Sequence, residues 1–584
     1  MHVRRQFRYW GVNAGRERSL RAAAIGLLFT VAAVFVVQRA VVRPFDRLPG
    51  GRRLSATVPM LNAWTVWWNA DRLTHGFSHY WDAPIFYPVK GTFAFSDPQP
   101  ATCVVAPVVW GTGSAVPAYQ IYVVLSLVLN GVFAYRLGRR LSVDRVLSAA
   151  LGMAVVWLPL VHLHSDVLQW FGIWPILWMW ELLLTLRERP KTATAILLGV
   201  SYALLVAVCT HHALLIAIST TPVFWVTAPR KGFRRWITMI GIAGVTAGLL
   251  SAPIVWPMAK ILREHRFARS ERTVDALSAT WTNWASVPPS AWEAPAPPVP
   301  EASLHALNPG WGRVLAAAGG VIFLVGSRRR RAAGVFLLLT AVGGVLLSLG
   351  PHLHIWGLRP WEIARECCPP LAMVRNVFRF AYATQLAVVV LAAVGWSRAV
   401  RWCASCVLPG VWRFRSKVER HRLRVISAGV LCGLGGLGIV LEHVPPPAVA
   451  VYVPDVRRVP DWVAAIREHV EEGEAVCCLP FGAGRTVYEV EPSARWMMYG
   501  TKHGRPLVNG YSGFFPREWF EMGRLLGQGP ITEEGVAALR RVGVRWLVVD
   551  RKRMPDLFAV PPAQLGVHRV WAGNDGMELW RTAP

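Results

Sequence analysis

Two carboxylates lie in the stretch "WDAPIFYPVKGTFAFSDPQP", Trp81 to Pro100, among aromatic residues and prolines. Asp82 and Asp97 each sit in a proline-bounded turn, where an aspartate commonly accepts hydrogen bonds from local backbone amides. The alternative is catalysis, because a carboxylate within hydrogen-bond reach of a hydroxyl can take its proton as the hydroxyl attacks. Both interpretations stay open for both residues.

Two arginines lie in "MVRNVFRF", at the entry to a late apolar segment. Arg375 and Arg379 are four residues apart, which predicts that both face the same side of a helix entering the membrane. Two guanidiniums in that position suit a phosphate or pyrophosphate carried by a lipid. Arginine also anchors helices at membrane edges, so this simpler role stands beside the first.

The composition indicates the kind of protein that positions these groups. The chain has 584 residues, 53% of them hydrophobic and 17% charged, whereas an ordinary soluble domain is about one quarter charged. Its net charge of +29 is spread over short clusters between apolar segments. Nucleic-acid binding needs such residues gathered on a soluble surface, so we predict a polytopic membrane protein and no nucleic-acid partner.

Apolar runs of about 17 to 25 residues predict about eleven transmembrane helices. They are 21–42, 118–138, 145–163, 167–186, 193–208, 211–228, 236–258, 312–326, 332–349, 377–397 and 425–443. The two runs that meet near Cys209 to His212 also fit one long bent helix.

Basic clusters occupy every second connection, as the positive-inside rule requires. They are Arg4 to Arg8, Arg139 and Arg140, Arg187 to Lys191, Arg230 to Arg235, 328–331, and Arg398 to Arg424. This pattern predicts a cytoplasmic N-terminus and places the long segments 43–117, 259–311, 350–376 and the C-terminal part outside. The basic run "REHRFARSER", 263–272, is the exception, since it is predicted to be external.

The external segments hold further predicted elements. Residues 58–76 have Trp and Leu at helical spacing, which predicts an amphipathic helix on the membrane surface. We divide the chain into a membrane domain, 1–444, with its long first external loop 43–117, and a soluble α/β domain, 445–584. In the latter, "PDWVAAIREHVEEG" predicts a helix capped by Gly473, "AVCCLPF" and "VRWLVVD" predict strands, and Asn574-Asp575-Gly576 predicts a hairpin turn.

Several strings together resemble a known family. "LNAW" with the Trp81 to Pro100 stretch, "HLHSDVLQWFGIWPIL" and "VRNVFRF" resemble bacterial polytopic membrane proteins related to the GT-C glycosyltransferases. "RPLVNGYSGFF" is similar to a C-terminal segment of such proteins. The resemblance implies a bundle of membrane helices, a polyprenyl-phosphate sugar donor, and an acidic residue of the first external loop as the base.

Matched residue by residue, the resemblance assigns eight candidate site residues. The catalytic candidates are Asp82, Asp97 and Asp46, and the substrate-binding candidates are Arg375, Arg379, His164, Gln169 and Asn62. The chain departs from the family at Thr57 or Val58, where many relatives carry an aspartate. Asp46 is the one acid soon after the first span, so if it does not reach the site, Asp82 or Asp97 must act or no transfer occurs.

The C-terminal motif, Asn509 to Gly513, also allows two interpretations. With Lys502, His503 and Arg505 nearby, it is a candidate grip for an acceptor glycan. The structural alternative is a glycine-requiring turn whose aromatic neighbours pack the small domain onto the membrane part.

We therefore expect an inverting glycosyltransferase of the bacterial inner membrane that moves a sugar from a polyprenyl-phosphate donor to an envelope glycan, lipid or protein on the external, periplasmic face. The alternative is a non-catalytic membrane protein that binds or translocates lipid-linked glycans. A solute transporter ranks lower, because transporters tend to place their sites at the bilayer midplane between paired halves. No metal ligands are assigned, although a divalent cation is left open.

Overall fold

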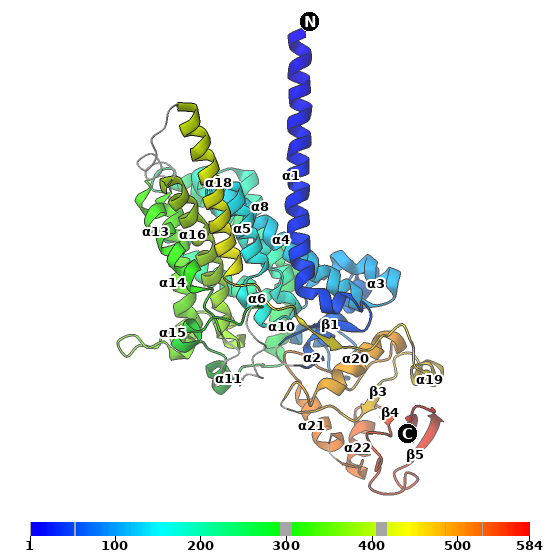
Figure 1. Cartoon of the computed structure of the whole chain (residues 1–584). Coiled ribbons are helices and arrows are strands. Elements are labelled where there is room, and N and C mark those ends of the chain that lie inside the picture. The colour runs from blue at the N-terminus through cyan, green and yellow to red at the C-terminus, as the bar shows by residue number, and fades with distance from the viewer. Residues whose placement is uncertain are drawn as a thin grey trace.

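The computed structural model describes residues 2–51, 54–291, 306–328, 330–403, 417–484, 486–527 and 529–583. The chain forms a helical bundle with a smaller α/β part at one end (Figure 1). The N-terminus, at the tip of α1 (His2–Val41), lies at the opposite end of the molecule from the C-terminus.

Every predicted span overlaps a helix. After α1 the bundle contains α4 (Ala115–Arg140), α5 (Arg145–Val156), α6 (Pro159–Leu163), α7 (Trp174–Glu188), α8 (Thr192–Val208), α9 (Thr210–Val226), α10 (Phe233–Glu264), α13 (Trp311–Gly326), α14 (Arg331–Ser348), α16 (Ala381–Trp402) and α18 (Lys417–Leu441). Among the described residues, 6 helical segments are long and apolar enough to cross a membrane. They are Ser19–Val41, Ala115–Arg140, Arg145–Leu163, Phe233–Glu264, Arg331–Ser348 and Val377–Trp402.

The helices α8 and α9 are separate. Cys209 between them is extended, with φ −159° and ψ 110°. The Tyr202 hydroxyl of α8 donates to the Ala213 carbonyl of α9 at 3.3 Å, so the two helices lie against each other. The alternative of one long bent helix is therefore wrong.

Glycines bring α13 and α16 into close backbone contact. A Cβ at Gly320 would collide with the Leu391 carbonyl, and a Cβ at Gly395 would collide with the Ala316 carbonyl. The adjacent Gly319 has no such neighbour within 4 Å. Small residues at Gly320 and Gly395 thus let the two helices approach, as is common where helices pack in membranes.

The first loop packs between the bundle and the C-terminal part. It contains β1 (Arg47–Gly50), α2 (Thr57–Thr74), the 3-10 helices η1 (Thr92–Phe95) and η2 (Pro100–Val105), and α3 (Ala106–Thr112). The predicted helix at 58–76 is confirmed as α2, but most of its residues are buried against α4, α3 and α20. Trp64 and Trp68 pack into the protein, so this face of the helix is covered by protein, and its position relative to the membrane surface stays a prediction.

The C-terminal part is a small α/β unit tied to the first loop. Strand β2 (Val449–Tyr452) pairs antiparallel with β1. A second sheet has the order β3-β4-β6-β5, in which β3 and β4 are parallel and the other pairs antiparallel. The elements are α19 (Asp461–His469), β3 (Val476–Leu479), α20 (Glu491–His503), α21 (Arg517–Leu526), α22 (Glu533–Arg541), β4 (Trp546–Asp550), β5 (Val567–Ala572) and β6 (Met577–Thr582).

The predicted strands and hairpin of this part are confirmed, with the turn at 573–576. The predicted helix is α19, but its end was placed too late: it stops at His469, and Gly473 lies in the following turn with φ 91°.

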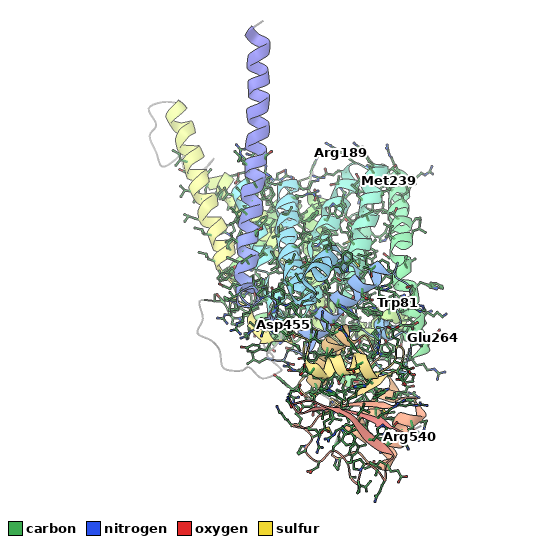
Figure 2. All side chains as sticks on the ribbon, turned by 90° about the vertical axis from the view of Figure 1, so that its right-hand side faces the viewer. Trp81, Arg189, Met239, Glu264, Asp455 and Arg540 are labelled. Atoms are coloured by element: carbon green, nitrogen blue, oxygen red, sulfur yellow. The ribbon has the colours of Figure 1, made fainter. Side chains whose placement is uncertain are left out.

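Short elements connect the rest of the bundle. They are η3 (Leu168–Trp170), α11 (Glu271–Ala276), α12 (Trp281–Ala285), η5 (Gly350–His352), α15 (Pro360–Cys367), η6 (Pro369–Met373) and η7 (Val377–Phe380). Arg189, from one predicted cytoplasmic cluster, lies at the end of the bundle away from the C-terminal part, and Glu264 lies at the near end (Figure 2). Of the other basic clusters, residues 329 and 404–416 and the side chains before residue 19 and of residues 417–425 fall outside the described parts.

Candidate functional site

A polar cavity of about 100 Å³ lies where the first loop, the bundle and the C-terminal part meet. Its polar lining includes one carboxylate and three guanidiniums. They come from Asp97, Arg269, Arg375 and Arg379, with Gln169 and His211 beside them and Phe95, Met258, Leu262 and Phe514 among the apolar walls. The structure thus brings four of the eight predicted site residues, Asp97, Gln169, Arg375 and Arg379, to one cavity.

Asp97 is 2% exposed and is held by the start of α9. Its Oδ1 accepts hydrogen bonds from the Thr210 amide at 3.3 Å and the Thr210 hydroxyl at 3.2 Å. Its Oδ2 is buried, has no hydrogen-bond partner among the described residues, and lies 3.7 Å from Nδ1 of His211. One oxygen of Asp97 is therefore fixed, and the other can accept a proton or a hydrogen bond.

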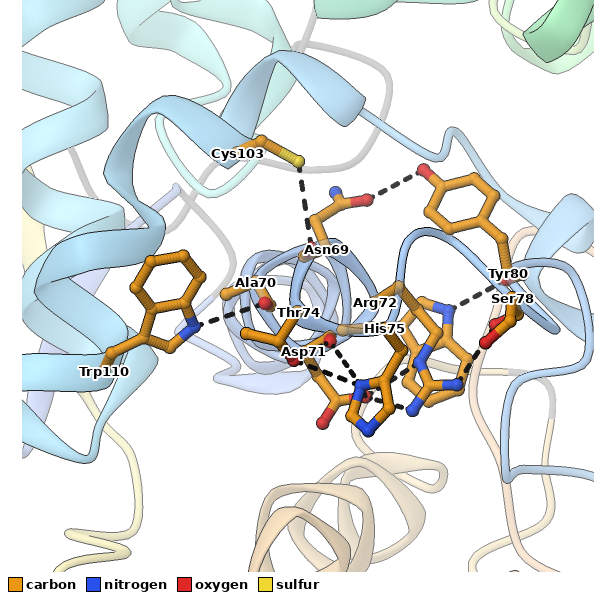
Figure 3. Close-up of polar contacts among 11 residues, drawn as sticks. Asn69, Ala70, Asp71, Arg72, Thr74, His75, Ser78, Tyr80, Cys103 and Trp110 are labelled. Atoms are coloured by element: carbon orange, nitrogen blue, oxygen red, sulfur yellow. Dashed lines mark hydrogen bonds and ion pairs between the residues drawn. The ribbon is translucent and has the colours of Figure 1, made fainter.

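The turn that follows Asp97 is fixed by α2. The amide of Asn69 donates to the carbonyls of Pro98, at 2.8 Å, and Gln99, at 3.1 Å. Asn69 is in turn held by the Tyr80 hydroxyl, which donates to its side-chain oxygen at 2.7 Å (Figure 3). Because all these atoms are buried, each lost bond would leave an unpaired polar group. This network fixes the backbone next to Asp97, and Thr210 orients its side chain.

Gln99 links two predicted site residues. It adopts the left-handed conformation, with φ 47°, and is 2% exposed. Its amide donates to Asn62 Oδ1 at 3.1 Å and to Gln169 Oε1 at 3.3 Å. Asn62 therefore lies one layer behind the cavity and helps to orient Gln169 through Gln99.

The two predicted phosphate-binding arginines line the cavity, but not from one helix. Arg375 lies in the loop before η7 and is exposed, Arg379 belongs to η7, and α16 begins only at Ala381. The prediction of a shared helix face is wrong, because the chain enters the bundle through a 3-10 turn. A loop and a tight turn still direct both guanidiniums to the same space.

Arg379 rests on an aromatic platform. Its guanidinium carbon lies 4.4 Å from the centre of the Trp170 ring, and it is 8% exposed. The His164 ring packs edge-on against Trp170 at 4.3 Å, so His164 supports this platform and does not line the cavity. The Nε of Arg379 is buried and has no hydrogen-bond partner among the described residues.

Sequence reasoning missed Arg269 and Phe514 as site residues. The signal for Arg269 was present: it belongs to the basic run 263–272, which broke the positive-inside pattern. This excess of arginine on the predicted external side is the feature of the sequence that sets Arg269 and its neighbours apart. Nothing in the sequence pointed to Phe514 beyond its place next to the glycine-rich motif.

The other two acids lie outside the cavity. Asp82 accepts a hydrogen bond from the Gly91 amide at 2.9 Å, which is the structural role expected of an aspartate in a turn. Asp46 lies 3.7 Å from Arg43, next to the β1–β2 pair. Neither lines the cavity with Arg375 and Arg379.

Thr57, which stands where relatives carry an acid, is fully buried, and its hydroxyl donates to the Val487 carbonyl at 2.5 Å. This position contacts the C-terminal part and does not line the cavity.

The C-terminal motif is pinned in place by its asparagine. The side chain of Asn509 donates to the Cys478 carbonyl at 2.8 Å and accepts from the Cys478 amide at 2.7 Å, which attaches the motif to β3. Lys502 and Arg505 donate to the carbonyls of Gly113 and Val470. These contacts favour the structural interpretation of Asn509, Lys502 and Arg505.

Asp97, Cys209 and His211 offer one possible metal-ligand set. One donor atom from each lies within 4.8 Å of the other two. A carboxylate, an imidazole and a thiolate together suit zinc better than magnesium or calcium. The three guanidiniums that line the same cavity disfavour the further positive charge of a metal ion there.

An apolar groove of about 1000 Å³ lies next to the polar cavity. Residues of α7, α8, α9 and α10 line it, and it extends to Ala259 and Arg263 of α10. Met258 and Leu262 of the same helix line the polar cavity, so one stretch of α10 borders both spaces. A long apolar chain in the groove would bring a polar head to the arginines.

A scan against models of known families and a search of curated proteins each give no match. The fold is similar to that of a mutant arabinofuranosyltransferase AftD from Mycobacteria, with a TM-score of 0.54, 13% sequence identity, and coverage of 96% of this chain and 41% of AftD. This chain thus spans less than half of the AftD length.

The fold is also similar to that of the archaeal oligosaccharyltransferase AglB from Archaeoglobus fulgidus, solved with an inhibitory peptide and a dolichol-phosphate. That comparison has a TM-score of 0.51, 12% identity, and coverage of 92% of this chain and 70% of AglB. These likenesses show that the chain shares the fold of AftD and AglB, which agrees with the GT-C-like fold implied by the sequence resemblance, and 6 of its described helical segments are long and apolar enough to cross a membrane.

Proposed function

We propose that this chain is a membrane glycosyltransferase that moves a sugar from a polyprenyl-phosphate donor to an envelope glycan, lipid or protein acceptor on the side of the C-terminal part. The observation that carries the proposal is Oδ2 of Asp97, which is buried without a hydrogen-bond partner among the described residues and lies in the same cavity as Arg375 and Arg379. A base and a phosphate-binding pair in one place are what sugar transfer from a lipid phosphate requires.

The proposed reaction is a single displacement. The acceptor hydroxyl forms a bond to the anomeric carbon while the bond from that carbon to the lipid-phosphate oxygen breaks, and the phosphate leaves with the electron pair. Asp97 Oδ2 takes the proton of the hydroxyl. One displacement inverts the configuration at the anomeric carbon. Thr210 keeps the carboxylate oriented by occupying Oδ1.

Arg375 and Arg379 stabilise the departing phosphate in this mechanism. Arg379 already packs on Trp170, so its side chain loses little conformational entropy when the phosphate binds. Arg375 is exposed at the cavity and is free to close on the ligand. Preorganised positive charge where negative charge develops is commonly the largest contribution to catalysis.

The apolar groove along α10 supplies a place for the lipid chain. It is bordered by apolar helices of the bundle and ends beside the arginine cavity. This arrangement favours a donor with a long hydrocarbon tail over a soluble sugar nucleotide, which would leave the groove unused.

The test compares three single aspartate variants in a deletion strain complemented with each. We expect Asp97→Asn to abolish the envelope product and to cause the polyprenyl-phosphate sugar to accumulate, as measured by lipid and glycan mass spectrometry. A general base contributes about 10²- to 10⁴-fold to the rate. Asp82→Asn and Asp46→Asn are matched controls, because both acids lie outside the cavity.

A normal envelope product in the Asp97→Asn strain would refute this mechanism. If wild type and all variants bind the lipid and none transfers sugar, the chain is the non-catalytic glycan-lipid binding protein instead.

A further inference from the structure

Arg269 reaches the cavity from the external connection after α10 and is held there by the C-terminal part. Its Nη2 donates to the Gly513 carbonyl at 2.8 Å. Its guanidinium carbon lies 3.5 Å from the centre of the Phe514 ring. Gly513 is the last residue of the C-terminal motif and Phe514 follows it, more than two hundred residues along the chain from Arg269.

The Gly513-Phe514 clamp is itself fixed to the first loop. The Phe514 amide donates to the Phe95 carbonyl at 2.9 Å. A Cβ at Gly513 would lie 2.7 Å from that carbonyl oxygen, so the close approach requires glycine. The Phe514 ring also stacks on Phe267, with centres 4.7 Å apart.

The charge of Arg269 is not balanced by its present contacts. Its partners are a neutral carbonyl and an aromatic ring, and its Nε is buried without a hydrogen-bond partner among the described residues. Burial, and then the neighbouring charges of Arg375 and Arg379, lowers the pKa of Arg269 to about 9, so the guanidinium remains charged at neutral pH. Three cations facing one carboxylate leave room for an anion.

We propose that Arg269 is a third ligand of the lipid phosphate and that Gly513 and Phe514 position it, so that the donor site is complete only while the C-terminal part is docked. The inference rests on the proposed donor site and adds a phosphate contact that the C-terminal part controls. Phe514 acts through Arg269, and it is a positioning residue that does not itself bind the phosphate.

The test measures equilibrium binding of undecaprenyl phosphate and of undecaprenol to the purified full-length protein in nanodiscs. We expect Arg269→Ala and Phe514→Ala to weaken undecaprenyl phosphate binding about tenfold or more, because a charge-assisted hydrogen bond is lost or misplaced. Undecaprenol binding should change less than about twofold, which a general loss of folding would not allow. Arg269→Lys should recover part of the phosphate affinity.

Matched controls come from the same segments. Arg272 is exposed and outside the cavity, and Phe520 is 59% exposed, so Arg272→Ala and Phe520→Ala should bind undecaprenyl phosphate like the wild type. If Phe514→Ala does not fold, Gly513→Ala makes the same test, because it displaces the clamp and keeps the ring.

The outcomes separate the two proposals. Wild-type phosphate affinity in both Arg269→Ala and Phe514→Ala would overturn this inference and leave the donor site of Arg375 and Arg379 standing. If the wild type itself does not prefer undecaprenyl phosphate over undecaprenol, the cavity is not a phosphate site, and the proposed function fails together with the inference.

Discussion

Replacing Arg379 by methionine should have opposite effects on binding and on stability. Arg379 is buried, and its Nε has no hydrogen-bond partner among the described residues. Its guanidinium carbon lies 4.4 Å from the centre of the Trp170 ring, and a desolvated cation–π contact of this kind stabilises the protein by about 1 to 2 kcal/mol. Among the described residues, Asp97 is the one carboxylate that lines the cavity with the three guanidiniums, so it cannot balance all of them, and a buried cation without a paired anion costs several kcal/mol. We therefore expect Arg379 to contribute to ligand binding and not to the stability of the empty protein.

The expected magnitudes follow from this balance. A hydrogen bond to a charged group contributes about 1.5 to 3 kcal/mol, so Arg379→Met should raise the Kd for undecaprenyl phosphate about ten- to a hundredfold. The melting temperature of the ligand-free protein should stay the same or rise, because methionine keeps much of the side-chain volume and removes the charge. Arg379→Lys should give an intermediate Kd, since it keeps the charge and loses the planar fork.

The assay combines thermal unfolding without ligand and equilibrium binding, both on protein in nanodiscs. A variant that melts several degrees lower and binds undecaprenyl phosphate like the wild type would refute the reasoning. In that case Arg379 would be a structural residue of the α16 entry.

Two further predictions concern stability. Gly320→Ala should destabilise the bundle by about 1 to 3 kcal/mol, because the added Cβ would collide with the Leu391 carbonyl. Gly319→Ala, whose Cβ would meet nothing within 4 Å, should be neutral or slightly stabilising. Equal melting temperatures for the two variants would contradict the close α13–α16 contact. Burial, and then the charges of Arg505 and Arg467, lowers the pKa of His503 to about 3 from an unfolded value near 6.5. The unfolded state therefore binds the proton first, and the free energy of unfolding should fall by about 1.4 kcal/mol per unit as the pH drops from about 6.5 towards 3. His503→Asn should flatten this pH dependence in unfolding experiments, and an unchanged slope would show that another group causes it.

The helices were predictable because the residues of each segment alone determine whether it forms a membrane helix. A long apolar run has one stable solution in a membrane, so every predicted span overlaps a helix, and the strands of the C-terminal part follow their apolar runs. The end of α19 was placed wrongly because a glycine suggested a cap that the chain uses in the next turn. Element boundaries depend on such small local energies.

The site was only partly predictable because it joins distant segments. Asp82 and Asp97 look alike in sequence, as acids in proline-bounded turns. What separates them is the contact of Asp97 with Thr210, 113 residues away. Arg269 was visible only as a charge anomaly, and its aromatic partner Phe514 belongs to another part of the chain. Long-range packing of this kind leaves no periodic signal in the sequence.

The central claim is that the cavity of Asp97, Arg375 and Arg379 holds the phosphate of a polyprenyl lipid whose tail lies along α10. The most direct measurement is a cryo-EM map of the full-length protein in nanodiscs with undecaprenyl phosphate. We expect density for the phosphate beside the guanidiniums of Arg375 and Arg379, and density for the chain in the groove between α8, α9 and α10. Lipid density at another surface, with the arginine cavity empty, would contradict the account.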